Sequence, residues 1–271
     1  MGGKDYTWTE SRFKRYIQEG RGLGELREYR PWLEVDDVPS TGQQHKKLGW
    51  KTNREHHLLS NLEEYYFYIL EWTDDVVDIR EQYPLDFEET EQICNKKSIK
   101  HPVDNKTQVI IPFTTDFFIT VRRNKNIEYV ARTVKQSVDL EDERNLEKFE
   151  VEREYYARKG IDWGIVTEKD IPNIFVLNIQ DFHGYSRLEQ EFKEYKELFM
   201  QYFIESPQNY SIVDITSRFD TLYNLSVGSA LSIFKHFLAQ KRIIIVDMFS
   251  PISFRIQKKN FKVSCRKDKM V

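Results

Sequence analysis

The fold of the first half of the chain is decided by residues 114–135, which read TTDFFITVRRNKNIEYVARTVK. Two runs rich in β-branched and aromatic residues, Thr114–Val121 and Glu128–Lys135, flank the polar segment Arg122–Ile127. Runs of this kind on either side of a short polar segment are typical of a β-hairpin. The sequence therefore predicts two antiparallel strands here.

The register of this hairpin would bring an acid and a lysine together. If Val121 faces Glu128, Asp116 lies opposite Thr133 on the same face, at about 5 Å between Cβ atoms. Lys135, two residues beyond Thr133, lies on that face as well. A slip of one residue would separate these side chains. A carboxylate can hold Mg²⁺, and an ammonium group can orient water and offset phosphate charge, so the pair suggests a hydrolytic site.

This arrangement resembles the PD-(D/E)xK nucleases, which have a second acid two residues before the lysine. Here Thr133 occupies that position, so a metal site must obtain negative charge from elsewhere. Glu63, on a helix predicted over residues 56–72, is the first candidate. Glu152, on a helix predicted over residues 140–158, is a second candidate metal ligand, since it lies near the edge of that helix's buried stripe.

The elements around the hairpin complete a mixed α/β unit. The helix over residues 140–158 carries the apolar stripe Leu146, Phe149 and Tyr156 and is closed by Gly160. The remaining predictions are a helix over residues 7–19 with Thr7 and Glu10 at capping-box spacing, an irregular segment over 25–55, a strand over Val76–Tyr83, a loop over 86–108 and a strand over Trp163–Thr167.

The C-terminal part has a different pattern. Three predicted helices are followed by two predicted strands, an order that indicates a winged-helix version of helix-turn-helix. The helices are Leu188–Ile204, Ile215–Tyr223 and Val227–Gln240, and the strands are Arg242–Met248 and Ser253–Gln257. Pro172 and Gly184 interrupt the pattern, so we expect a boundary within 170–187 and divide the chain into domains 1–175 and 176–271.

Composition limits the possible classes of protein. The chain has 271 residues, of which 39% are hydrophobic and 31% charged, and no apolar run approaches the length of a membrane-spanning helix. Two cysteines lie far apart, and none of the six histidines has zinc-type spacing. The net charge is −3, yet residues 255–271 contain seven basic residues and one acid. This basic tail could contact phosphate or an acidic partner, and the sequence leaves both open.

A series of short motifs runs through the first two thirds of the chain. These stretches are Gly20-Arg21-Gly22, Tyr29-Arg30-Pro31-Trp32-Leu33, Val38-Pro39-Ser40, His56-His57-Leu58-Leu59-Ser60-Asn61-Leu62-Glu63, Asp78-Ile79-Arg80-Glu81-Gln82-Tyr83-Pro84-Leu85, Thr115-Asp116-Phe117, Val134-Lys135 and Leu146-Glu147-Lys148. In these stretches and in their order the chain resembles the TnsA family, the endonuclease subunit of heteromeric DNA transposases.

The resemblance implies a restriction-endonuclease-like core with a winged-helix C-terminal domain. It places Glu63, Asp116 and Lys135 at the catalytic acid, acid and lysine positions, and it lets the Val134 carbonyl join the acids as a metal ligand. The family has Gln where this chain has Thr133. The implied cofactor is Mg²⁺, for which Mn²⁺ substitutes.

The resemblance also implies a reaction and partners. The protein would cleave the 5′ strand at transposon ends, beside a TnsB-like DDE transposase and a TnsC-like AAA+ ATPase. It would be a cytoplasmic, nucleoid-associated protein with no membrane partner.

Several alternatives remain at the level of sequence. Ser60 and Glu63 have capping-box spacing, so Glu63 could simply cap a helix. The adjacent His56 and His57 would diverge by about 100° on a helix, which favours capping or packing over chelation. The protein could also be a stand-alone restriction or repair nuclease, or a winged-helix assembly protein whose nuclease half has decayed.

Overall fold

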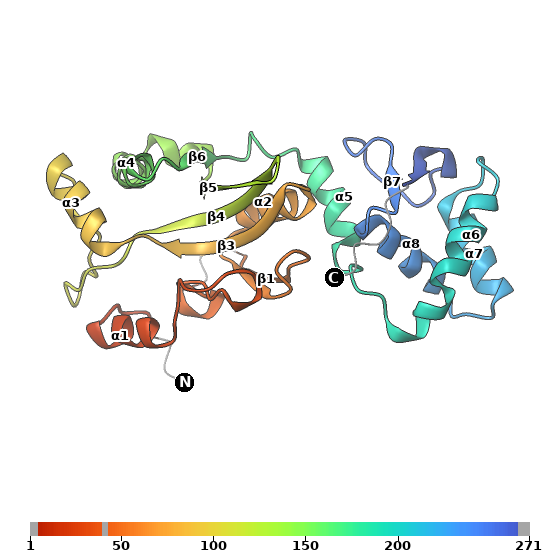
Figure 1. Ribbon diagram of the computed structural model, residues 1–271, viewed down its shortest axis with the longest axis horizontal. Helices are drawn as coiled ribbons and strands as arrows, with labels where there is room; N and C mark the ends of the chain where they lie inside the picture. Colours follow the sequence, from red (N-terminus) through yellow and green to blue (C-terminus); the bar gives the residue numbers. More distant parts are fainter. Residues whose placement is uncertain (1–4, 40–42, 265–271) are drawn as a thin grey trace. The chain divides into compact units, whose positions relative to one another are not determined.

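The computed structural model describes residues 5–39 and 43–264. The chain divides into two compact units, the first ending at Ile171 and the second beginning at Pro172 (Figure 1). The first unit contains a four-stranded sheet, and the second is mainly helical. The structure thus confirms the predicted mixed α/β class.

The sheet of the first unit has the strand order β3-β4-β5-β6. β3, β4 and β5 are antiparallel, and β6 runs parallel to β5. Val121 pairs with Glu128, so the predicted hairpin register is confirmed, but the pairing ends at Phe117 and Arg132, one position before Asp116. The strands are β3 Val76–Pro84, β4 Thr114–Arg123, β5 Asn126–Val134 and β6 Asp162–Val166.

Helices cover both faces of this sheet. Neighbouring residues of a strand point to opposite faces. Phe117 meets Tyr66 of α2 (Asn61–Trp72) edge-on, with ring centroids 5.5 Å apart. Phe118 instead packs in a core with Tyr156 of α4. α4 (Glu143–Arg158) connects β5 to β6 and packs against α3 (Phe87–Lys97).

The predicted helix over residues 56–72 begins too early. α2 starts at Asn61, because Ser60 has an extended backbone and accepts a hydrogen bond from the Glu63 N–H as the N-cap. His56 lies in β2 (Glu55–Leu58), which pairs with β1 (His45–Leu48) in the segment predicted to be irregular. The helical geometry assumed for the two histidines is therefore wrong, although His56 is fully buried.

Three other local predictions of the first unit are wrong. α1 (Glu10–Gln18) is capped by Thr9, not Thr7. The segment predicted as a loop contains α3, which begins after the N-cap Asp86. Leu146 is 48% exposed, so the buried stripe of α4 is formed by residues around Phe149 and Tyr156. Short 3₁₀ helices span Leu26–Glu28, Val35–Asp37 and Ser137–Glu141.

The second unit is built around a cluster of buried phenylalanines that includes Phe199, Phe219, Phe234 and Phe237. Helices followed by a two-stranded antiparallel sheet agree with the predicted order, and the winged-helix assignment itself stays a prediction. The elements are α5 Asn173–His183, a 3₁₀ helix Gln190–Tyr195, α6 Lys196–Glu205, α7 Ile212–Leu222, α8 Ser229–Ala239, β7 Ile243–Ile245, a 3₁₀ helix Lys258–Asn260 and β8 Phe261–Val263.

Two segments of this unit differ from the prediction. The strand expected over Ser253–Gln257 is wrong, because β7 pairs with Phe261–Val263 instead. α5 occupies residues that had been assigned only to a boundary, since its apolar side chains Val176 and Ile179 are fully buried.

The basic tail is only partly a surface feature. Arg255, Lys259 and Lys262 are exposed, whereas Lys258 is buried and donates hydrogen bonds to the carbonyls of Ile204 and Ser206 at the end of α6. Arg266, Lys267, Asp268 and Lys269 lie outside the described residues.

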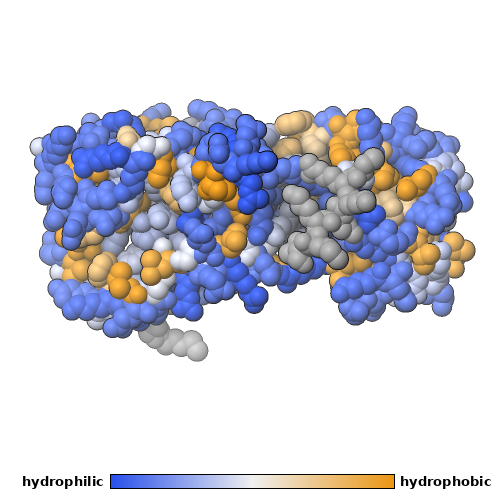
Figure 2. Space-filling model, in the orientation of Figure 1, coloured by the Kyte–Doolittle hydropathy of each residue, from blue (hydrophilic) through white to orange (hydrophobic). Residues whose placement is uncertain are grey.

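Most of the surface visible in Figure 2 is hydrophilic, with small apolar patches. Among the described residues, no helix combines the length and apolar character needed to cross a membrane.

Candidate active site

Glu63 lies at the N-terminus of α2 and is only 5% exposed. Its Oε2 accepts a hydrogen bond from the Leu59 N–H at 2.9 Å, and its Oε1 accepts one from the Ser60 hydroxyl at 3.0 Å. Ser60 in turn accepts a bond from the Glu63 N–H. The Ser60 half of the capping box considered from the sequence is therefore present, whereas the Glu63 carboxylate is held by the Leu59 N–H and the Ser60 hydroxyl and not by the Ser60 N–H.

Asp116 of β4 contacts the lysine predicted to accompany it. Its Oδ2 accepts hydrogen bonds from the Lys135 ammonium at 2.9 Å and from the Val134 N–H at 2.7 Å. The ladder of β4 and β5 ends one position before Asp116 and Thr133, and the Thr133 hydroxyl donates to Glu152, so the placement of Asp116 opposite Thr133 stays a prediction. Pairing of β4 with β5 has already ended at this point, which frees the Val134 N–H for the Asp116 side chain.

The amide of Gln82 lies between the two acids. Its Nε2 is 3.4 Å from Glu63 Oε2 and 3.5 Å from Asp116 Oδ1. Its Oε1 accepts a bond from the Thr114 hydroxyl at 3.4 Å. Gln82 was not among the predicted site residues. The signal for it is the β3–β4 register, in which the pairs on either side place Gln82 opposite Asp116.

Glu152 of α4 lies on the Thr133 side of the site and is 4% exposed. Its Oε2 accepts hydrogen bonds from the hydroxyls of Thr133 at 2.6 Å and Thr115 at 2.9 Å, with the Trp163 indole N–H at 3.3 Å. Within residues 5–39 and 43–264, no three His, Cys, Asp or Glu side chains gather as a metal-binding group. The ligand roles of Glu152 and of the Val134 carbonyl stay predictions.

The buried charges perturb one another. Burial, followed by the charge of Asp116, raises the pKa of Glu63 to about 7. Burial also raises the pKa of Glu152 to about 7, against hydrogen bonds that favour its ionised form. Burial alone would lower the pKa of Lys135, but Asp116 and Glu63 outweigh it and raise that pKa. The lysine is thus held charged close to Glu63 and Glu152, whose ionised forms burial disfavours.

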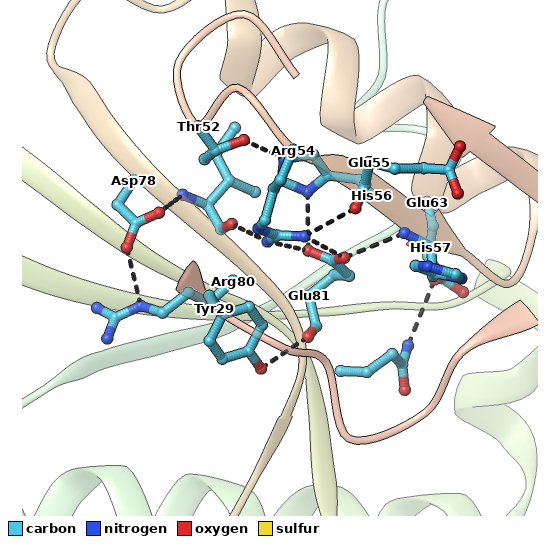
Figure 3. Close-up of polar contacts among 12 residues, drawn as sticks. Tyr29, Thr52, Arg54, Glu55, His56, His57, Glu63, Asp78, Arg80 and Glu81 are labelled. Atoms are coloured by element: carbon cyan, nitrogen blue, oxygen red, sulfur yellow. Dashed lines mark hydrogen bonds and ion pairs between the residues drawn. The ribbon is translucent and has the colours of Figure 1, made fainter. Parts of the chain in front are cut away.

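A buried network behind the site anchors β3 (Figure 3). Glu81 is fully buried and accepts hydrogen bonds from both terminal nitrogens of Arg54, at 2.7 and 2.6 Å, and from the His57 N–H at 3.0 Å. His56 Nδ1 lies 2.8 Å from Glu81 Oε2. Burial alone would raise the pKa of Glu81, but His56 and Arg54 hold it well below its usual range. The network fixes the residue that directly precedes Gln82.

Solvent reaches Glu63 and Lys135 through a pocket of about 450 Å³. Its wall is formed by residues from the start of α2 and from the segment after β5, which are Gln43, Ser60, Asn61, Leu62, Glu63, Val134, Lys135, Gln136 and Asp139. A ligand in this pocket would meet the carboxylate and the ammonium together.

Two family models and one known protein match most of the chain. The family model for the TnsA-like endonuclease N terminal matches residues 73–168, and the model for the TnsA endonuclease C terminal matches residues 170–248. The chain is 36% identical over 233 residues to the transposon Tn7 transposition protein TnsA of Escherichia coli, covering 86% of this chain and 84% of that protein. The chain belongs to the TnsA endonuclease family. The TnsA N-terminal model spans Asp116, Lys135 and Glu152, whereas Glu63 precedes it.

Proposed function

We propose that this TnsA-family endonuclease is Mg²⁺-dependent and cleaves the 5′ strand at transposon ends during cut-and-paste transposition. The observation that supports the proposal is that Glu63, Asp116 and Lys135 lie close together although they come from three separate segments of the chain. Glu63 and Lys135 line one pocket, and Asp116 contacts Lys135. Two carboxylates can hold a metal ion that assists phosphodiester hydrolysis, and a lysine beside them can stabilise the negative charge that develops on the phosphate.

The acid pair, Glu63 and Asp116, fits a hard divalent cation. Both side chains offer oxygen ligands, which Mg²⁺ prefers and Mn²⁺ accepts. The raised pKa of Glu63 reflects burial and repulsion by Asp116, which Lys135 and the hydrogen bonds to Glu63 only partly offset and which a cation would offset further. The Val134 carbonyl and Glu152 are further candidate ligands. When bound, the cation would polarise the phosphate and lower the pKa of the attacking water.

The chain's own groups would position the substrate. The Lys135 ammonium, held by Asp116 at 2.9 Å, presents a fixed positive charge at the pocket and would stabilise charge that develops on the phosphate. The Leu59 N–H and the Ser60 hydroxyl hold the Glu63 carboxylate in place before any ligand binds. This prior ordering lowers the cost of assembling the reactive arrangement.

We further propose that the protein acts beside a TnsB-like DDE transposase and a TnsC-like AAA+ ATPase. The net charge of −3 gives the chain little electrostatic attraction for DNA of its own. Exposed Arg255, Lys259 and Lys262 would contact phosphate or an acidic surface of a partner.

The test is Asp116→Asn in the complete system with donor DNA and Mg²⁺. We expect loss of 5′ cleavage while 3′ joining by the transposase persists. Asp75→Asn, at an exposed position before β3, serves as the matched control and should cleave normally. Undiminished 5′ cleavage by Asp116→Asn would contradict the proposal. Efficient cleavage of ordinary duplex DNA by the chain alone would indicate a stand-alone nuclease.

A further inference from the structure

The buried Gln82 side chain lies between the carboxylates of Glu63 and Asp116 in the proposed site. It is 2% exposed, and its amide nitrogen is within 3.5 Å of one oxygen of Glu63 and one of Asp116. The Thr114 hydroxyl on the amide oxygen fixes the orientation in which the NH₂ group faces the acids. A neutral donor thus lies between two groups of like charge.

The backbone of Gln82 shows that this placement has a cost. Its φ is +48°, in the left-handed region, although it lies inside a nine-residue strand with paired residues on both sides. Residues other than glycine are disfavoured in this region, and they persist there when the surroundings hold them. Glycine would fit the backbone better, so the conformation alone does not explain the presence of glutamine.

Hydrogen bonds to the backbone carbonyls of Glu81 and Gln82 hold this conformation. The Trp32 N–H donates to the Gln82 carbonyl at 3.2 Å, and the Tyr29 hydroxyl donates to the Glu81 carbonyl at 2.9 Å. The Glu81 side chain is locked by Arg54 and His56. The strained residue is therefore fixed from the strand itself and from two other segments.

We propose that Gln82 is a positioning residue that holds the carboxylates of Glu63 and Asp116 together and thereby raises the affinity of the site for a divalent cation. This inference rests on the proposed function. Two ionised carboxylates repel each other. Without the bridging amide, only the separate hydrogen bonds that hold each acid would oppose this repulsion, and the two carboxylates would lie further apart. Cation binding would then have to bring them back together, which weakens it.

The decisive variant is Gln82→Gly, which removes the amide and relieves the backbone. Titration calorimetry of the full chain with Mg²⁺, and separately with Mn²⁺, should show the dissociation constant rising about tenfold or more, as for other residues that orient metal ligands. The midpoint of thermal unfolding should stay the same or rise. The rate of 5′ cleavage with partners should fall as well.

Gln108→Gly is the matched control, because Gln108 also has a left-handed φ of +58° but is exposed and belongs to a loop. It should leave cation affinity and cleavage at wild-type values. Gln82→Asn, which keeps an amide on a shorter side chain and tolerates left-handed φ, should give an intermediate dissociation constant and serves if the glycine variant fails to fold.

The outcomes separate this inference from the proposed function. Wild-type cation affinity in Gln82→Gly and Gln82→Asn, together with loss of binding in Asp116→Asn, would overturn the role of Gln82 and leave the function standing. If Asp116→Asn binds the cation as the wild type does, the acid pair is not the cation site and both proposals fail.

Discussion

The buried Arg54–Glu81 pair should be the most sensitive point of the first unit. The Arg54 side chain is 7% exposed and that of Glu81 is fully buried, so neither charge is well solvated. Arg54→Met removes the cation and keeps an apolar side chain. Glu81 would then retain a buried negative charge with His56 and one backbone N–H as its remaining hydrogen-bond partners among those described.

Removal of one partner of a buried ion pair typically costs about 3–5 kcal/mol of the free energy of unfolding. Arg54 also donates to the carbonyls of Ile79 at 2.7 Å and Leu26 at 3.2 Å, and the variant leaves these without that donor. We therefore expect the upper part of this range. With a urea dependence of about 2 kcal/mol per molar, the midpoint of unfolding should fall by about 2 M.

Tryptophan fluorescence isolates the unit in which this loss occurs. All five tryptophans of the chain precede Ile171, so their signal reports the first unit within the full-length protein. Arg153→Met is the matched control, since Arg153 forms a two-bond pair with Glu150 on the exposed surface of α4. Exposed pairs of this kind contribute little to stability, so the urea midpoint of this variant should stay near the wild-type value.

The double variant Arg54→Met, Glu81→Gln completes the test. It removes both buried charges, so it should recover part of the stability that the single arginine variant loses. A loss in Arg54→Met no larger than that in Arg153→Met, or a double variant less stable than Arg54→Met alone, would refute this explanation of the network.

Two further predictions concern other buried groups. The pKa of Glu152 in the folded protein, about 7, lies above its ordinary value of 4.5, so the contribution of Glu152 to stability falls as pH rises from 4.5 to 7. In urea unfolding, Glu152→Gln should therefore gain about 2 kcal/mol of stability relative to wild type between pH 5.5 and pH 8. A difference that does not change with pH would contradict this. Lys258→Met should destabilise the second unit by about 1–3 kcal/mol, seen as faster hydrogen exchange in α6, because two carbonyls lose their buried donor. Lys259→Met, at the exposed neighbour, should leave exchange unchanged.

The hairpin of β4 and β5 was predictable because two runs rich in β-branched and aromatic residues flank a short polar segment. The β-rich runs determined both strands, and the register that pairs Val121 with Glu128 is the one observed. The contact between Asp116 and Lys135 followed from this register. Apolar alternation did not reveal that pairing stops at Phe117, since this depends on the side chain of Asp116 capturing the Val134 N–H.

The errors arise where one residue satisfies two patterns. Leu59 and Leu62 have helical spacing, yet Leu59 lies between the end of β2 and the start of α2, and only Leu62 belongs to the helix. The helix α3 was missed because only one narrow side of it is buried, which leaves a mostly polar sequence. Gln82 carries no local signal at all, since its role requires the register of β3 against β4.

For Glu63, a helix-capping contact and the proposed catalytic role need not be alternative explanations. Both of its oxygens accept hydrogen bonds at the start of α2, and the positive end of the helix dipole favours its ionised form. These contacts offset only part of the cost of burial beside Asp116, because the pKa still rises to about 7. A bound cation would supply the positive charge that this carboxylate lacks in the protein alone. The hydrogen bonds at the start of α2 therefore explain the position of Glu63, and its incompletely compensated negative charge explains its proposed affinity for metal.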